Sequence, residues 1–263
     1  MTSPLLQDTT NLWNALLTAS KLVSKDEPAL ASFIHEAISS WPSYSEALSN
    51  LIIKNLNPSK SSQVSLEDLV KEALKGDPNI ASQSLFDLQA IQERDPACKS
   101  PVEAFLFYRG FKALQCYRVA HYFWSSQRYT LARYLQSVSV ESFSMDIHPG
   151  ARIAQGIFID HGTGIVIGET AIIEKNVSIL HNVTLGGTGK TSGARHPTIR
   201  EGVMLGAGCK ILGNITVGKN SKVAAGSIVL QDVPDNTTAV GIPARIVERD
   251  KSEVPAYEMK QEI

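Results

Sequence analysis

Histidine side chains gather in the second half of the sequence, where four of the six lie within a span of 49 residues. These four are His148, His161, His181 and His196. His161 stands in the segment IFIDHGTGIVIGET (157–170), directly after Asp160. An imidazole beside a carboxylate can take a proton from a hydroxyl group at neutral pH, whereas a polar residue on an exposed corner is enough to explain His148 and His181. The pattern therefore predicts a general base at His161.

A glycine-rich segment, GGTGKTSGARHP (186–197), contains Arg195 and the last of these histidines, His196. Its glycines leave backbone N–H groups open to anions, and the guanidinium adds positive charge. The net charge of the chain is only −1, so any anion must be attracted by a local cluster of this kind. We expect a small anionic ligand here, and neither nucleic acid nor a membrane as a partner.

The elements that position these residues repeat every six residues. Aliphatic side chains recur at this spacing in three series: Ile147, Ile153, Ile159 and Ile165; Ile167, Ile173, Ile179 and Leu185; and Ile199, Leu205, Ile211, Val217, Val223 and Val229. This period predicts a solenoid in which each hexapeptide is a short strand with a turn and three hexapeptides form one coil of a triangular prism. Stacked coils would bury the aliphatic column.

Two interruptions of this period fall beside the candidate site residues. The series slips by two residues just after His161, and eight extra residues precede Ile199. Because a solenoid accepts insertions only on its outside, residues 186–198 are expected to project as a loop. With three hexapeptides, or eighteen residues, in a regular coil, Asp146 and His161 are expected near one edge on neighbouring coils. That placement predicts a catalytic dyad in which the carboxylate orients the ring.

Residues 1–140 have the period of amphipathic helices instead. In SLEDLVKEALKGDP, for example, Ser65 can cap the start of a helix and Gly76 can end it. Several such segments predict a helical bundle. We therefore predict an α+β chain with a helical domain at 1–140, a solenoid domain at 141–247 and a flexible polar tail at 248–263.

The composition, with 43% hydrophobic and 19% charged residues, is that of an ordinary soluble protein. The sequence has no apolar run long enough to span a membrane and no leader pattern, which predicts a cytoplasmic location. The three cysteines, Cys98, Cys116 and Cys209, lack metal-binding spacing and are expected to be reduced.

The hexapeptides resemble those of the hexapeptide-repeat acyltransferases, which form a left-handed parallel β-helix, and AVGIPARIV (239–247) resembles their last coil. The chain is similar more specifically to bacterial serine O-acetyltransferases in DLQAIQERDPA, GFKALQCYRVAHYFW, MDIHP and DHGTG. The resemblance implies direct acetyl transfer from acetyl-CoA to the serine hydroxyl, giving O-acetylserine for cysteine biosynthesis. In it, His161 matches the family's general base and Asp146 the carboxylate that orients it.

The resemblance also implies how both charged ends of serine are bound. Asp95 and Asp160 match the family's contacts to the substrate ammonium group. Arg195 and His196 match its contacts to the substrate carboxylate. Asp95 has a second explanation, since a residue before proline often ends a helix.

For acetyl-CoA, the resemblance implies contacts from the backbone N–H groups of Ala207 and Ala225 and from the Lys222 side chain. The N–H groups around Gly187 would stabilise the oxyanion. Without the resemblance, Lys222 is an ordinary solvated charge. The family further implies a homo-oligomer (a trimer, or a dimer of trimers) with active sites between subunits, feedback inhibition by L-cysteine, and binding of O-acetylserine sulfhydrylase to the C-terminal Ile263.

Three other functions are compatible with parts of the sequence. Another hexapeptide acyltransferase, acting on a sugar or a different amino-acid derivative, would share the coils but would not need Asp95 or the Arg195–His196 pair. A zinc hydratase of the carbonic anhydrase type would use three of the four histidines, which are spaced 13, 20 and 15 residues apart, whereas the acyltransferase needs no metal. A non-catalytic scaffold would leave Asp146, His161 and the loop unexplained.

Overall fold

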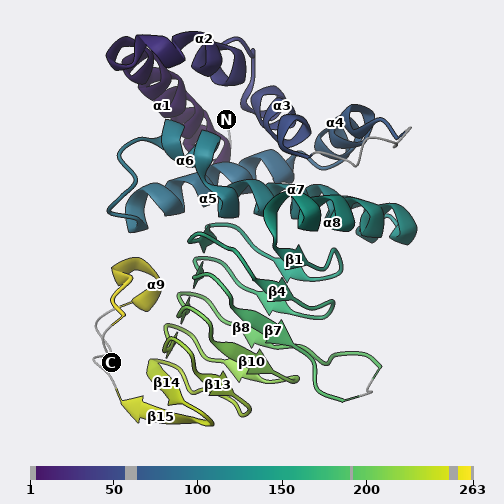
Figure 1. Cartoon of the computed structure of the whole chain (residues 1–263), viewed down its shortest axis with the longest axis vertical. Coiled ribbons are helices and arrows are strands. Elements are labelled where there is room, and N and C mark those ends of the chain that lie inside the picture. The colour runs from purple at the N-terminus through teal and green to yellow at the C-terminus, as the bar shows by residue number, and fades with distance from the viewer. Residues whose placement is uncertain (1–3, 57–63, 190–191, 249–253, 262–263) are drawn as a thin grey trace.

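The structure is a computed structural model that describes residues 4–56, 64–189, 192–248 and 254–261. Figure 1 shows a layer of helices stacked on one end of a column of short strands, with the C-terminal helix α9 beside the column. A long loop projects from the column after β7, as expected for the insertion at 186–198. The arrangement confirms the α+β class with helices first and a parallel β-solenoid second.

The helical domain consists of α1 (Pro4–Asp26), η1 (Pro28–Leu30), α2 (Ala31–Ile34), η2 (His35–Ser39), α3 (Tyr44–Asn55), α4 (Leu66–Gly76), α5 (Asn79–Arg94), α6 (Pro101–Phe107), α7 (Arg109–Ser125) and α8 (Tyr129–Phe143). The helix predicted after Ser65 is α4, and the Ser65 hydroxyl accepts a hydrogen bond from the Asp68 N–H at 3.2 Å. In the described part of the chain, no helix combines the length and the apolar character needed to cross a membrane.

The column contains three sheets, one on each face of the prism. One sheet is formed by β1 (Asp146–Ile147), β4 (Val166–Ile167), β7 (Thr184–Gly186), β10 (Lys210–Leu212) and β13 (Ile228–Val229). The second is formed by β2 (Arg152–Ile153), β5 (Ile172–Ile173), β8 (Thr198–Ile199) and β11 (Thr216–Val217). The third is formed by β3 (Phe158–Ile159), β6 (Ser178–Ile179), β9 (Met204–Leu205), β12 (Lys222–Val223), β14 (Thr237–Gly241) and β15 (Ala244–Glu248). Neighbouring strands are parallel except for β15, which pairs antiparallel with β14.

The predicted aliphatic series forms the interior of the column. All fourteen side chains are at most 8% exposed, and thirteen of them lie on strands. Ile165 is the exception, because it lies in the corner two residues before Ile167 and does not continue the column of Ile159. Its side chain is nevertheless buried, so the corner residue fills the interior beside the column.

The two interruptions set the lengths of the coils. Asp146 pairs with Val166, a step of 20 residues, whereas Thr198 pairs with Thr216, a regular step of 18. Ile172 pairs with Thr198, a step of 26. These steps are two and eight residues longer than the regular coil, which confirms both the slip after His161 and the eight-residue insertion.

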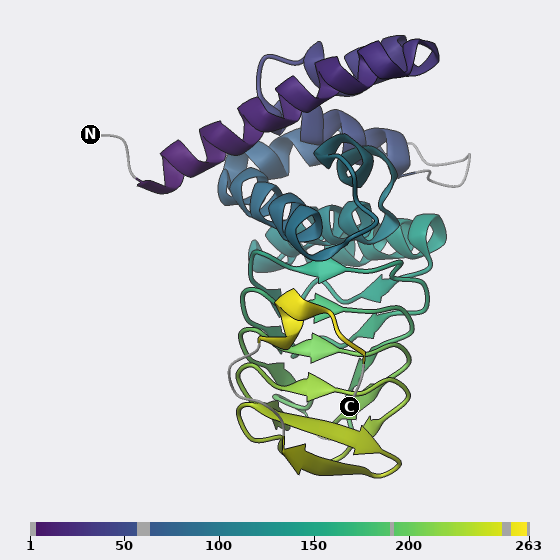
Figure 2. The same cartoon turned by 90° about the vertical axis from the view of Figure 1, so that its left-hand side faces the viewer.

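Part of the segment assigned to a flexible tail forms a short helix, α9 (Pro255–Glu258), that packs on the column. Figure 2 shows α9 in front of the face that ends in β14 and β15, which is the third sheet. Ala256 is fully buried, and its carbonyl accepts a hydrogen bond from the Ser178 hydroxyl at 2.8 Å. The Arg94 guanidinium of α5 lies 4.5 Å from the centre of the Tyr257 ring. This helix therefore connects the helical domain to the third sheet.

A buried ion pair fastens the helical domain to the first coil. Arg118 on α7 and Asp87 on α5 lie 2.7 Å apart, with side chains 2% and 0% exposed. Arg118 also donates to the carbonyls of Ile153 and Ala154, and Asp87 accepts from the N–H of Ile157 at 2.9 Å. Because both charged side chains are buried, removing one of them leaves an uncompensated charge.

Replacing Asp87 with alanine is therefore expected to lower the free energy of unfolding by about 3–5 kcal/mol, the range for breaking a buried pair. Chemical denaturation at one fixed protein concentration measures the change. Glu72→Ala is the matched control, because it breaks a pair with Arg128 whose side chains are 44% and 46% exposed, and it should have little effect. Equal stabilities of the two variants would contradict the assigned role of Asp87.

Candidate active site

A cavity of about 630 Å³ lies where the helical domain meets the last corner of the first coil of the β-helix. Asp95, Tyr108 and Arg109 line it from the helical side, and Asp160 and His161 line it from the corner between β3 and β4. The fold thus brings three sequence-predicted residues, Asp95, Asp160 and His161, to one cavity within a single chain.

The corner that carries His161 contains the two extra residues of the first coil. His161 has a left-handed backbone conformation with φ of 56°, and Gly162 follows with φ of 82°. This conformation is uncommon for a residue with a side chain and is a frequent feature of functional sites. The Asp160 N–H fixes the start of the corner by donating to the carbonyl of Ile179 at 2.9 Å. The His161 side chain is 78% exposed, so a substrate can reach the ring.

The start of α7 approaches this corner closely because residue 110 is glycine. A Cβ atom on Gly110 would lie 2.2 Å from the carbonyl oxygen of Ile159, a separation that side chains do not adopt. This contact sets Tyr108 at the cavity, where its hydroxyl donates to Asp95 at 2.7 Å. Asp95 also accepts from the N–H of Ala97 at 2.8 Å, so its carboxylate is held in place.

The electrostatics of the cavity favour a cation. Burial raises the pKa of Asp160, and His161 opposes this shift while the negative charge of Asp95 adds to it. The repulsion between two nearby carboxylates is relieved when a positive group lies between them. The His161 Nε2 and Asp160 Oδ1 atoms lie 3.7 Å apart, so that a cation bound here would stand beside the imidazole. An amine substrate fits this arrangement.

Asp146 lies on β1, which is separated along the chain from the corner that carries His161 by β2 and β3. The Gln136 side-chain amide donates a hydrogen bond to Asp146 Oδ1, and the residue that pairs with Asp146 on the next coil is Val166. Val166 directly follows the corner that carries Asp160 and His161. Within the described residues, no hydrogen bond joins the two side chains, so the dyad stays a prediction.

Arg195 and His196 lie at a different edge of the prism. They follow β7 and precede β8, whereas Asp160 and His161 follow β3 and precede β4. Arg195 pairs there with Glu169 at 2.5 Å, an interaction that holds the pKa of the Glu169 carboxyl below its usual value. One chain therefore does not bring the predicted carboxylate contacts to the predicted ammonium contacts.

Two residues expected to contact CoA share an edge with His161. Ala207 and Ala225 occupy the same corner on the third and fourth coils, and neither N–H has a hydrogen-bond acceptor within the described residues. His181 stands between them and His161, with its ring centre 6.2 Å from that of His161. Lys222 lies on β12 and is 6% exposed, so it is not the solvated charge that the sequence alone suggested.

Gly187 directly follows β7 and lies near Arg195 rather than near His161. Its N–H, like those of the two alanines, has no acceptor among the described residues. The residues expected to contact acetyl-CoA are therefore divided between two edges of one chain.

The remaining histidine of the predicted cluster, His148, is structural. It accepts from the Gly150 N–H at 2.9 Å and packs edge-on against Trp124, with ring centres 4.8 Å apart. Burial and the charge of Arg133 lower the pKa of His148 to about 4, so the ring is neutral. The four histidines thus divide between two edges, and no group of three metal-binding side chains is found among the described residues.

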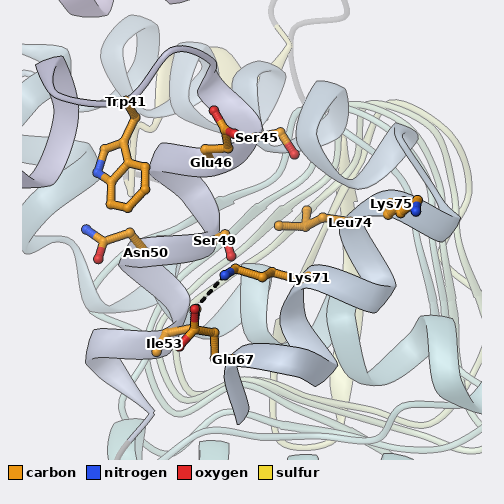
Figure 3. Close-up of a pocket in the computed structure, with 10 residues that line it drawn as sticks. All are labelled: Trp41, Ser45, Glu46, Ser49, Asn50, Ile53, Glu67, Lys71, Leu74 and Lys75. Atoms are coloured by element: carbon orange, nitrogen blue, oxygen red, sulfur yellow. Dashed lines mark hydrogen bonds and ion pairs between the residues drawn. The ribbon is translucent and has the colours of Figure 1, made fainter. Parts of the chain in front are cut away.

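A second cavity, of about 470 Å³, lies in the helical domain between α3 and α4. Figure 3 shows Trp41 and the Lys71–Glu67 ion pair among the side chains that line this cavity. The charged groups of that pair satisfy each other. None of the residues predicted to act in catalysis or binding lines this cavity, so it is separate from the candidate site.

Sequence reasoning did not single out Tyr108, Arg109, Glu169 or Thr170. Tyr108 and Arg109 reach the cavity only because α7 packs on β3. No local pattern in the sequence predicts a contact between these two distant segments. Glu169 and Thr170 lie in a corner just after Gly168. The sequence signal that could have identified them is a pair of polar residues at a tight turn.

Comparison with known proteins gives one consistent result. Residues 12–116 match the family described as serine acetyltransferase, N-terminal, and residues 196–231 match the bacterial transferase hexapeptide family. A serine acetyltransferase from Haemophilus influenzae is 47% identical over 253 residues, which cover 96% of this chain and 95% of that protein.

Two solved structures extend this similarity to the fold. A serine acetyltransferase in complex with cysteine is 47% identical, with a TM-score of 0.93 over 97% of this chain and 99% of that one. A serine acetyltransferase in complex with CoA is 46% identical, with a TM-score of 0.86 over 91% and 100% of the two chains. The left-handed sense expected for the β-helix is thereby confirmed. Together with the helical domain and the corner that carries His161, these matches show that the chain is an acyltransferase and belongs to the serine acetyltransferase family.

Proposed function

We propose that this protein transfers the acetyl group of acetyl-CoA to the hydroxyl group of L-serine and so supplies O-acetylserine for cysteine biosynthesis in the cytoplasm. The observation that carries the proposal is the cavity in which Asp95, Asp160 and His161 meet. Its paired carboxylates suit the ammonium group of an amino acid, and the exposed imidazole suits a hydroxyl nucleophile. Family membership supplies the reaction class.

His161 is assigned the role of general base. Its ring takes the proton from the serine hydroxyl as the oxygen attacks the thioester carbonyl, so that the new C–O bond forms without an acyl-enzyme. The C–S bond then breaks, and the thiolate of CoA receives the proton from the imidazolium. Asp146 is assigned as the carboxylate that orients the ring.

Acetyl-CoA is placed along the edge of the prism that carries His161, next to the following coils. The N–H groups of Ala207 and Ala225, which have no acceptor among the described residues, lie at this edge. CoA is present in a solved relative that is 46% identical. No metal is assigned to the reaction, because a thioester already contains a good leaving group and the base is a protein side chain.

The serine site is completed by a second copy of the chain. Arg195 and His196 lie on a different edge from Asp95 and Asp160, so one chain cannot hold both charged ends of serine. In a trimer of parallel prisms, the edge that carries Arg195 in one copy can face the edge that carries His161 in the next. Assembly of two trimers through the helical domains is the corresponding family arrangement.

Cysteine is assigned to the same site as an inhibitor. It has the ammonium and carboxylate groups of serine and differs only in the atom that would be acetylated. A solved relative that is 47% identical holds cysteine. Asp95, Asp160, Arg195 and His196 are therefore expected to contact both amino acids.

The experiment that tests the proposed function is a thiol-release assay with acetyl-CoA and a panel of amino acids and sugars. Release of CoA that depends on L-serine supports the proposal, and mass spectrometry of the product should show one acetyl group on the serine oxygen. Release that depends on a sugar, with none from serine, would instead identify another hexapeptide acyltransferase.

O-acetylserine sulfhydrylase is assigned as a partner through Ile263, which lies outside the described residues. Deleting Ile263 is expected to abolish co-elution of the two proteins in size-exclusion chromatography, because one buried C-terminal side chain would anchor the complex. Ile242→Ala is the matched control, since it removes an isoleucine that is 71% exposed at another site. Unchanged co-elution after the deletion would rule out this mode of binding.

A further inference from the structure

The corner formed by Gly168, Glu169 and Thr170 acts as a seat for the Arg195–His196 step of the projecting loop. The Thr170 hydroxyl accepts hydrogen bonds from the N–H groups of Arg195 and His196, at 3.0 and 3.1 Å. Glu169 holds the Arg195 guanidinium in an ion pair. The loop therefore returns to the column at a defined point, although it is inserted on the outside of a coil.

The same corner fixes the protonation form of the His196 ring. The backbone N–H of Thr170 donates to Nδ1 at 3.2 Å, and the Thr170 hydroxyl lies 2.9 Å from this atom. An imidazole nitrogen that accepts a hydrogen bond carries no proton, so the single proton of the neutral ring must be on Nε2. Burial and the charge of Arg195 lower the pKa of His196, so the neutral form is favoured.

This corner also leaves space for the imidazole ring of His196. A Cβ atom on Gly168 would lie 2.0 Å from both Cδ2 and Nε2 of His196, so only glycine leaves room for the imidazole. A Cβ atom on Gly187 would lie 3.4 Å from the same Nε2. Nε2 has no hydrogen-bond partner within the described residues, which leaves its N–H as a donor for a ligand.

We propose that Thr170 is a positioning residue for carboxylate recognition, which holds His196 as a neutral Nε2–H donor beside the Arg195 guanidinium. This inference rests on the proposed function, in which these two side chains bind the carboxylate of serine. Arg195 supplies the charge, and His196 supplies a directed hydrogen bond that does not depend on protonation of the ring. Substrates without a free carboxylate, such as serine amides or esters, would gain nothing from the seat.

The first test compares Thr170→Val, which keeps the shape but removes the hydroxyl, with Thr170→Ser, which keeps the hydroxyl. Thr170→Val is expected to raise the KM for serine by about 10-fold or more, because a displaced His196 no longer donates to the charged carboxylate of serine, while the KM for acetyl-CoA stays unchanged. Thr170→Ser should restore the KM for serine. Gly168→Ala should reproduce the defect by displacing the ring, and Thr216→Val, on β11 and away from the seat, should have no effect.

The second test does not depend on activity. In protein with ¹⁵N-labelled histidine, the ring nitrogens of His196, assigned by their loss in His196→Gln, should show the neutral Nε2–H form at pH 7. An Nδ1–H form or a cation would overturn the inference. So would a KM for serine that is normal in Thr170→Val but raised in His196→Gln. A wild-type protein that does not acetylate serine would instead overturn the proposed function, and the nitrogen signals would still decide whether the seat fixes the ring.

Discussion

Replacing His161 with alanine is expected to lower the rate of serine-dependent CoA release by about 10²–10⁴-fold, the usual effect of removing a general base. The serine hydroxyl is a weak nucleophile while it carries its proton, and His161 is the exposed imidazole that lines the cavity with Asp95 and Asp160. Steady-state assays at saturating serine and acetyl-CoA measure the loss in kcat. The KM for serine should change much less, because the paired carboxylates remain.

His181→Ala is the matched control, because the two rings lie at the same edge with centres 6.2 Å apart. Its effect on kcat should be smaller, since His181 does not line the cavity that contains Asp95. A larger loss in His181→Ala than in His161→Ala would move the base to the second ring. A rate in His161→Ala equal to that of the wild type would remove His161 from its role.

The hexapeptide column could be predicted from the sequence because its physical cause is local and periodic. Every inward position must be aliphatic, so Ile147 and Val229 obey the same rule although they lie at opposite ends of the column. The slip after His161 and the projecting loop were visible for the same reason, as breaks in that period. Asp160 and His161 then stood out as polar residues that the repeat does not require.

The sequence does not reveal residues whose position depends on contacts between domains. The register of the coils places Asp146 opposite Val166, and the contact of Asp146 with His161 stays a prediction. Tyr108 reaches the cavity only through the close approach of Gly110 to Ile159, which joins residues about fifty positions apart in the sequence. No local pattern contains such a contact.

Coexpressing the inactive variants His161→Ala and Arg195→Ala is expected to restore about a quarter of the wild-type activity, if each site combines one edge from each of two neighbouring copies. Each variant alone should be nearly inactive. In a random one-to-one mixture, half of the copies keep the base and half of their neighbours keep the guanidinium, so about one site in four is complete. The specific activity of the purified mixed oligomer measures the restoration.

The contrast with a second mixture decides where the site lies. Asp95 and His161 line the same cavity in one chain, so mixing Asp95→Ala with His161→Ala leaves a defect in every site and should restore nothing. A site built within one chain would leave both mixtures inactive, because Arg195 and His161 would then also have to be intact together. Restoration in the first mixture alone therefore requires that the edge with Arg195 and the edge with His161 meet between copies. The separation of these edges in the single chain is the physical reason to expect that result.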